Sequence, residues 1–253
     1  MRRRMTAITL GVLGTLSVLA VWAVIVELGL VSAKSLPSPF AVAGSLPALL
    51  ADPNFSASLA DTLGAWFVAM VIASVSAIVL GMIIGTVHFL SAPAMIVVNA
   101  LRSIPSSALI PIAILLFGLG SSMKIAVAVY AIFALVLINT IYGVAGREPM
   151  RIDAARSMRW NWWQQYLHLT LPSATPSIVT GIRLAAGISL VVVISTELLG
   201  AKSGIGITII QYQQALRIDM AYACITAVGI VGVLLYSILA AAERATIDRI
   251  RLV

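Results

Sequence analysis

Charged residues and cysteine are scarce in this chain of 253 residues. Only 10% of the residues are Asp, Glu, Lys or Arg, whereas 61% are apolar, and Cys224 is the one cysteine. Soluble domains carry roughly 25% charged residues, so this chain cannot cover its own surface in water. A single cysteine excludes an internal disulfide and a cysteine metal cluster. The composition therefore predicts a protein whose solvent is lipid.

Sequence patterns for catalysis and metal binding are also missing. The two histidines, His88 and His168, lie far apart and have no neighbouring cysteine or carboxylate, so no metal site is expected. The chain has no Gly-x4-Gly-Lys-Ser/Thr element and therefore cannot hydrolyse ATP by itself. The spans contain no Ser/His/Asp set. We expect neither an enzyme nor a cofactor bound by this chain.

Six apolar runs are long enough to cross a membrane, for which about 20 residues are needed. The predicted spans are approximately residues 8–31, 63–89, 95–117, 124–145, 178–199 and 221–242. The first run is much longer than the roughly 7–15 apolar residues of a signal peptide, so we expect it to be retained. Pro105 and Pro111 interrupt the third run. We expect one all-α transmembrane domain over residues 1–253.

The basic residues are distributed unequally between the two sides of this topology. Six spans place both termini on the same side as the polar stretch 146–168. That side carries ten arginines: Arg2, Arg3, Arg4, Arg147, Arg151, Arg156, Arg159, Arg244, Arg249 and Arg251. The other side carries four basic residues: Lys34, Lys124, Lys202 and Arg217. Because cytoplasmic loops are enriched in Lys and Arg, we expect both termini in the cytoplasm.

Small residues recur within the spans. Gly81 and Gly85 are four residues apart, and the fifth span carries Gly181, Ala185, Gly187 and Ser189. Small residues allow helix backbones to approach closely in lipid. We therefore expect them to pack helices, with pore lining as the alternative.

The polar stretch that joins the fourth and fifth spans carries a helix-forming segment and three tryptophans. Trp160, Trp162 and Trp163 favour an amphipathic helix at the membrane interface. The same stretch resembles the cytoplasmic coupling loop of binding-protein-dependent ABC importer permeases. That loop has the pattern Glu-Ala-Ala, three residues, Gly, nine residues, Ile, one residue, Leu-Pro. Residues 153–155, Arg159, and residues 169–172 match it without a gap, except that Asp153 replaces Glu and Arg159 replaces Gly.

Further pieces of the chain resemble the same family, in the subfamily that imports sulfonates, taurine and nitrate. The matching pieces are residues 36–39, 102–105, 108–111, 117–118, 139–140, 143–144 and 203–206. Asp61 departs from the family pattern, since an arginine is often found there, and so do Ala134 and Leu135. The loss of the glycine at Arg159 removes a flexible turn between two short helices.

This resemblance implies a type I importer fold in the bacterial inner membrane. It implies two permease chains, most simply a homodimer, with two cytoplasmic ATPase subunits that bind ATP and Mg, and an external solute-binding protein. The resemblance assigns contact with the ATPase to nine residues: Asp153, Ala154, Ala155, Arg156, Met158, Arg159, Leu169, Leu171 and Pro172. ATP-driven motion of these loops would switch the bundles between inward-open and outward-open states.

Seven polar residues within or near the spans are candidates for a solute pathway or gate: Arg102, Ser106, Ser107, Asn139, Thr140, Ser195 and Glu197. Helix packing uses the same residue types, so a structural role is the alternative. Glu197 and Arg183 lie fourteen residues apart in one span, roughly 21 Å along a helix, and cannot pair with each other. A stand-alone secondary transporter or channel is the competing function, but it requires ionisable groups near the membrane midplane.

Overall fold

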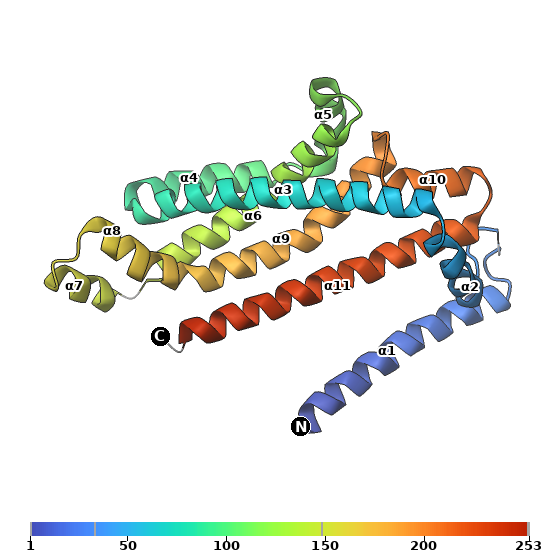
Figure 1. Ribbon diagram of the computed structural model, residues 1–253, viewed down its shortest axis with the longest axis horizontal. Helices are drawn as coiled ribbons and strands as arrows, with labels where there is room; N and C mark the ends of the chain where they lie inside the picture. Colours follow the sequence, from blue (N-terminus) through green and yellow to red (C-terminus); the bar gives the residue numbers. More distant parts are fainter. Residues whose placement is uncertain (1, 33, 148, 252–253) are drawn as a thin grey trace.

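The chain folds as a bundle of long helices. The computed structural model describes residues 2–32, 34–147 and 149–251, and every regular element in these ranges is helical. The long helices run roughly along one axis, with α7 and α8 at one end of the bundle and α2 and α10 at the other (Figure 1). These two ends are called the α7 end and the α10 end below.

The elements are α1 (Arg2–Glu27), α2 (Pro39–Leu50), α3 (Pro53–Thr86), α4 (His88–Arg102), η1 (Ser106–Leu109), α5 (Ile110–Phe117), α6 (Ser121–Ala145), α7 (Pro149–Ser157), α8 (Trp162–Gln165), η2 (Tyr166–Thr170), α9 (Leu171–Gly200), α10 (Ile205–Gln214) and α11 (Ile218–Arg251). Five helical stretches of the described chain are long and apolar enough to cross a membrane, and six if one bent pair counts as a span. The all-α membrane fold is therefore confirmed, with five or six candidate spans.

The bent pair occupies the third predicted span. Helix α4 ends at Arg102, and the segment Ser106–Phe117 continues at an angle of 74° to it. Pro105 and Pro111 explain the break, because proline has no backbone N–H to donate and restricts the residue before it. The chain turns into α4 at Val87, inside the second predicted span, 63–89.

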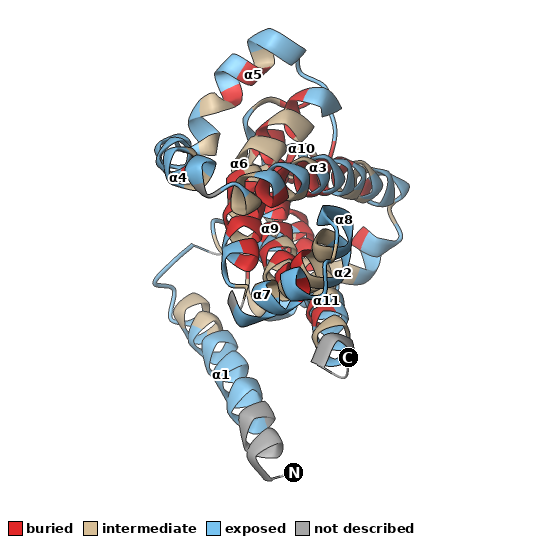
Figure 2. Cartoon of the chain, turned by 90° about the vertical axis from the view of Figure 1, so that its left-hand side faces the viewer, coloured by how far each residue is buried: buried red, intermediate tan, exposed pale blue. Residues whose placement is uncertain are grey.

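Close contacts between α3, α6 and α9 form the centre of the bundle. A Cβ atom added at Gly81 would lie 2.7 Å from the Thr140 Cβ, and one at Gly85 would lie 2.7 Å from the Val144 Cβ. A Cβ at Gly181 would lie 2.8 Å from the Asn139 Cβ. The packing role expected of these three glycines is confirmed. Buried residues gather where these helices meet (Figure 2).

Helix α1 stands apart from this centre. None of its apolar span from Thr9 to Glu27 is buried by the rest of the chain, and most of the described helix lies away from the bundle and meets it only at its C-terminal end (Figure 2). Near its end, the Trp22 indole donates a hydrogen bond to the carbonyl oxygen of Pro37 at 3.1 Å. An apolar helix this exposed must be covered by lipid or by another chain.

Candidate coupling segment and solute pathway

The segment between α6 and α9 projects from the bundle as a short helix, α7, at its end (Figure 1). Helix α7 begins at Pro149, four residues before Asp153, the first residue of the coupling pattern. The coupling loop predicted over residues 146–172, for which the sequence indicates a helical segment, contains α7, α8 and η2. The fifth apolar stretch begins at Trp162 rather than near residue 178.

Arg159 closes α7 in a left-handed backbone conformation, with φ 55°. The Arg159 N–H donates to the Arg156 carbonyl at 2.9 Å, and the Trp160 N–H donates to the Ala155 carbonyl at 3.1 Å. These two bonds form a Schellman motif, whose left-handed residue is usually glycine. The chain therefore forms a left-handed turn at the position where the coupling pattern it resembles has glycine, although the left-handed region costs an L-residue roughly 1–2 kcal/mol.

Two further features join this turn to α9. Asn161 and Gln164 form a capping box, in which the side chain of each accepts a hydrogen bond from the backbone N–H of the other. The π-helical turn η2 then continues into α9, with the Leu171 N–H donating to the Tyr166 carbonyl. Helices α8, η2 and α9 follow one another without a break from Trp162 to Gly200. The turn after Ser157 is therefore the only non-helical connection between α7 and α9 in the described chain.

Arg147 fixes the other side of the segment. Its Nε donates to the Val144 carbonyl at 2.7 Å, and its guanidinium donates to the Thr170 Oγ1 at 2.9 Å. The Trp160 ring packs edge-on against the His168 ring, with the centroids 5.9 Å apart. Arg147 therefore ties the end of α6 to η2, and the Trp160–His168 contact ties the turn after α7 to η2.

The predicted coupling residues differ in exposure. Five of them are exposed: Asp153, Ala154, Arg156, Met158 and Arg159. Ala155 is only 4% exposed, so of the Ala154–Ala155 pair only Ala154 is available to a partner. Leu169, Leu171 and Pro172 are half-buried at the start of α9. The Asp153–Arg156 ion pair, at 3.5 Å, is open to solvent and contributes little stability.

An aromatic cluster lies beside this face. Trp162 and Trp163 are exposed, with ring centroids 4.7 Å apart, and the Tyr166 ring stacks on Trp162 at 5.2 Å. Trp and Tyr rings are typical of the membrane–water boundary. The cluster lies at the first turn of the apolar stretch Trp162–Gly200, where an aromatic group at the membrane–water boundary is expected.

Two of the predicted pathway residues line a hollow of about 460 Å³ between α4, η1, α6 and α9. Arg102 is exposed there, and it makes no hydrogen bond or ion pair within the described ranges; Ser106 is half-buried. Val129, Phe133 and other apolar side chains form the remaining wall. Tyr130 closes one edge by donating to the Leu101 carbonyl at 2.6 Å.

The remaining pathway candidates are not brought together. Thr140 is fully buried against Gly81 and donates to the Val136 carbonyl. Asn139 is half-buried beside Gly181. Two other candidates are apart from them: Ser107 is exposed on η1, and Ser195 donates to the carbonyl one turn earlier in α9.

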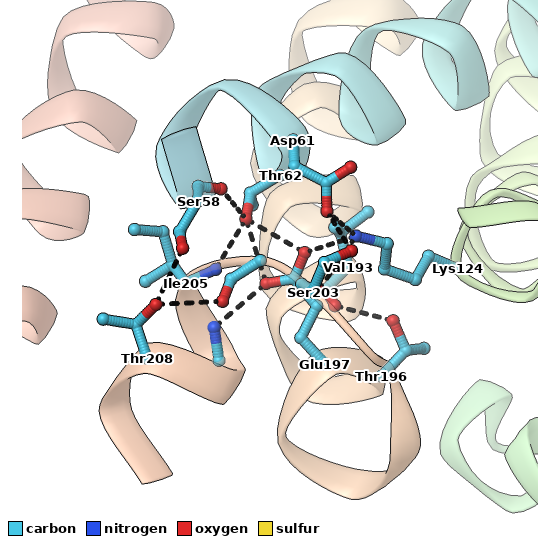
Figure 3. A network of polar contacts seen from close by, with 12 residues as sticks. Ser58, Asp61, Thr62, Lys124, Val193, Thr196, Glu197, Ser203, Ile205 and Thr208 are labelled. Atoms are coloured by element: carbon cyan, nitrogen blue, oxygen red, sulfur yellow. Dashed lines mark hydrogen bonds and ion pairs between the residues drawn. The ribbon is translucent and has the colours of Figure 1, made fainter. Parts of the chain in front are cut away.

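Glu197 lies in a polar network at the α10 end (Figure 3). The Lys124 Nζ is 3.0 Å from one Glu197 carboxylate oxygen and 2.7 Å from an Asp61 oxygen. Thr62 donates to Glu197 at 2.9 Å, and the Gly206 N–H donates to the same carboxylate at 3.0 Å. The network joins α3, α6, α9 and α10, and both Lys124 and Glu197 are fully buried in it.

Lys124, at the start of the fourth predicted span, is counted in the sequence among the basic residues opposite the termini; in the structure its ammonium group is buried between two carboxylates. A signal was available in the sequence: Asp61, Lys124 and Glu197 each lie near the same end of a different apolar run. Arg183 and Glu197 do not pair with each other, as expected from their spacing. Arg183 instead pairs with Glu243 of α11 at 2.8 Å.

The long apolar helices, with the buried ion pairs of Lys124 and Arg183 between them, define a polytopic helical membrane domain. Its described part contains no arrangement of residues typical of a catalytic site. Residues 77–251 match the family described as binding-protein-dependent transport system inner membrane component, and the chain belongs to that family. It is the permease subunit of an ATP-driven ABC importer in the inner membrane. Such subunits are not enzymes themselves, since ATP hydrolysis lies in separate subunits.

Curated relatives cover most of the chain. The putative aliphatic sulfonates transport permease protein SsuC of Bacillus subtilis is 31% identical over 90% of this chain and 82% of its own length. The taurine transport system permease protein TauC of Escherichia coli is 30% identical over 92% of this chain and 86% of its own. The nitrate import permease protein NrtB of Synechocystis is 29% identical over 80% of this chain and 77% of its own.

Solved structures share the fold at low sequence identity. An inward-facing MetNI methionine ABC transporter chain has a TM-score of 0.66 and 18% identity over 75% of this chain and 94% of its own. A chain of a bacterial alginate ABC transporter in complex with a pentasaccharide-bound periplasmic protein has a TM-score of 0.67. It is 15% identical and covers 96% of both chains. The expected type I importer fold is therefore confirmed.

Proposed function

We propose that α7 is the coupling helix of this importer and that it transmits the motion of a separate cytoplasmic ATPase to α9. ATP and Mg bind to that ATPase and not to this chain. Two permease chains, two ATPase subunits and an external solute-binding protein form the working assembly. The α7 end and both termini lie in the cytoplasm, in keeping with the arginines of residues 146–168.

The observation that carries this proposal is the ordered connection between an exposed short helix and a long membrane helix. Helix α9 has 30 residues, which corresponds to about 45 Å at 1.5 Å per residue. Its far end is joined to α3, α6 and α10 through Glu197. A displacement applied to α7 therefore moves α9 and, through it, the helices at the opposite end of the bundle.

A second copy of this chain is the proposed permease partner. The support for a partner is the apolar surface that the chain leaves uncovered, most clearly along α1, where no residue of the Thr9–Glu27 span is buried. A homodimer covers such surface with equivalent surface of the other copy. Lipid covers whatever remains.

The proposed solute is a small oxyanion such as a sulfonate or nitrate. The names of the curated relatives support this class, and Arg102 gives it a physical basis, because an exposed guanidinium without an internal partner can bind two oxygens of such an anion. Ser106, in the same hollow, can donate a further hydrogen bond. Arg102 and Ser106 are therefore the pathway residues that we propose to contact solute.

The coupling assignment is tested at Ala154. Ala154→Trp places a large side chain on the exposed face of α7, and we expect solute uptake by the reconstituted importer to fall by about tenfold or more, which corresponds to about 1.4 kcal/mol of lost docking. Ala154→Ser is the matched control and should retain uptake. The folded yield of Ala154→Trp should stay normal, because the side chain points away from the protein.

Ala155→Trp should behave differently. Ala155 is buried against its own chain, so the same substitution there should reduce the yield of folded protein. Normal uptake by Ala154→Trp, measured with its ATPase and binding protein present, would remove α7 from the coupling role.

A further inference from the structure

The break between α4 and η1 exposes polar groups near the middle of the bundle. Asn99, Arg102 and Ser103 are exposed, and their spacing of three and four residues places them on one face at the end of α4. Tyr130, which donates to the Leu101 carbonyl beside the break, lies near the middle of α6, so the break is far from either end of the bundle. Irregular backbone and charged side chains at this depth in a membrane protein lie against protein or water, not against lipid tails.

Helix α5 leaves the bundle at the same point. The segment Ser106–Phe117 makes an angle of 74° with α4, and α5 rises away from the other helices (Figure 1). Ile110 and Ala113 pack against the start of α6, but Leu115 is 86% exposed and Leu116 71%. A helix of 8 residues is about 12 Å long, too short to cross the hydrocarbon core by itself. An apolar arm therefore lies beside the exposed polar face.

A second copy of this chain is the partner that suits both surfaces. In a twofold interface the same patch contacts itself, so residues near the axis lie opposite their own equivalents. The exposed leucines of α5 provide the apolar contact that such an interface needs at its core. The polar face cannot close tightly, because the Arg102 guanidiniums of the two copies repel each other. The residues that line the hollow beside Arg102, all of them in the described chain, include no Asp or Glu, so only a bound anion can neutralise the pair.

We propose that two permease copies meet along α5 and the end of α4, and that they hold one oxyanion at a time between their two Arg102 side chains. Ser106 of each copy donates a further hydrogen bond to that anion. The inference rests on the proposed function, in which Arg102 contacts the solute and the permease works as a pair. It goes beyond that function because the site is shared by the two copies and is incomplete in one.

The chemistry of the proposed solute class suits a shared site. A sulfonate or nitrate group carries three equivalent oxygens, so two guanidiniums can bind it from opposite sides, each through a pair of N–H···O bonds. The apolar wall of the hollow, which includes Val129 and Phe133, limits the water around these bonds and so strengthens them. The same two charges repel cations, so the site also selects for anions.

The main experiment joins two permease copies in one polypeptide, so that each half can be changed separately. The tandem protein is reconstituted in liposomes with its ATPase and binding protein, and uptake of ethanesulfonate and of nitrate is measured at low solute concentration. We expect Arg102→Gln in one half to lower uptake about tenfold, because charge-assisted hydrogen bonds to the shared anion are lost. Two independent sites would instead keep about half of the uptake. Arg102→Lys in one half is the matched control and should lose about threefold or less, because it keeps the charge.

A cross-linking experiment tests the contact between the copies without relying on transport. Cys224 is the only cysteine in the sequence, so Cys224→Ala provides a background without thiols. In that background, a short bifunctional thiol reagent should join Ser103→Cys to its equivalent in the other copy. Val233→Cys is the control and should not be joined, because Val233 is 66% exposed on α11, which lies across the bundle from α5 (Figure 2). Adding Arg102→Gln should not lower the yield from Ser103→Cys, since the pair still assembles.

Each contrary result points to a different error. If Arg102→Gln in one half keeps about half of the uptake, each copy has its own site, and the shared site is wrong while the solute contact remains. If Ser103→Cys is not joined in an importer that transports, the copies do not meet at this face. If Arg102→Gln in both halves keeps full uptake, Arg102 does not contact solute, and the proposed pathway is wrong together with the shared site. If the natural protein takes up neither probe, the proposed solute class is wrong and the shared site with it.

Discussion

The backbone of Arg159 makes a quantitative prediction about the coupling segment. Its φ of 55° lies where an L-residue loses roughly 1–2 kcal/mol and glycine does not. The substitution Arg159→Gly removes this strain. Part of the resulting stabilisation is lost again, because glycine has more conformational freedom in the unfolded segment, an effect of about 0.4–1 kcal/mol. We therefore expect Arg159→Gly to stabilise the turn between α7 and α8 by about 0.5–1 kcal/mol.

The suitable assay is hydrogen exchange, because the turn opens locally and not only with the whole protein. The amides of residues 159 and 160 donate the two hydrogen bonds of the Schellman motif, so their exchange reports its opening directly. A gain of about 0.5–1 kcal/mol slows that exchange roughly two- to fivefold. Exchange near the centre of α6 and α9 should be unchanged.

A series at Arg159 separates backbone strain from loss of the side chain. Arg159→Asn should slow exchange less than Arg159→Gly, since asparagine tolerates the left-handed region only in part. Arg159→Ala should not slow it, because alanine remains strained. If alanine protected the turn as well as glycine, the arginine side chain and not its backbone would be the source of the cost, and the reasoning would be refuted.

Two further substitutions test the packing and the buried charges. Gly81→Ala should destabilise the permease by about 1–3 kcal/mol, because the new Cβ falls 2.7 Å from a side chain of α6. Gly64→Ala in the same helix is the control, since its Cβ meets nothing within 4 Å and the change should be neutral or stabilising. Thermal unfolding in detergent compares the two variants. Lys124→Met should cost about 3–5 kcal/mol, because it leaves two carboxylates without their cation. Adding Glu197→Gln should recover part of that loss, and a double variant less stable than Lys124→Met alone would contradict the ion-pair assignment.

Features that depend on residues close together in the chain could be predicted from the sequence. Long apolar runs predict spans because lipid requires about 20 apolar residues per crossing. The coupling pattern lies within residues 153–172, so its seven positions fall between α7 and the first turn of α9. Pro105 and Pro111 predict an interruption of the third span, but its 74° bend depends on how α4 and α5 pack against α6.

Features that depend on distant residues were not predicted. Lys124 lies at the end of a predicted span, and only the shared position of Asp61 and Glu197 at the same end of two other runs hints that these carboxylates converge on it. From the sequence, Arg159 in place of glycine is expected to remove a flexible turn. In the structure, two hydrogen bonds at the end of α7 form that turn with arginine in place. Leu216, after α10, also adopts the left-handed conformation without the glycine that usually signals such a helix end.

The π-helical turn between α8 and α9 sets the direction in which the coupling segment points. One additional residue in a helical turn changes the azimuth of everything before it by about 100°, the rotation per residue of an α-helix. The aromatic pair Trp162–Trp163 and the α7 helix therefore face a different side of the bundle than an unbroken α-helix would give them. Tightening this turn to an ordinary α-helical one would swing α7 around the α9 axis while α9 itself stayed in place.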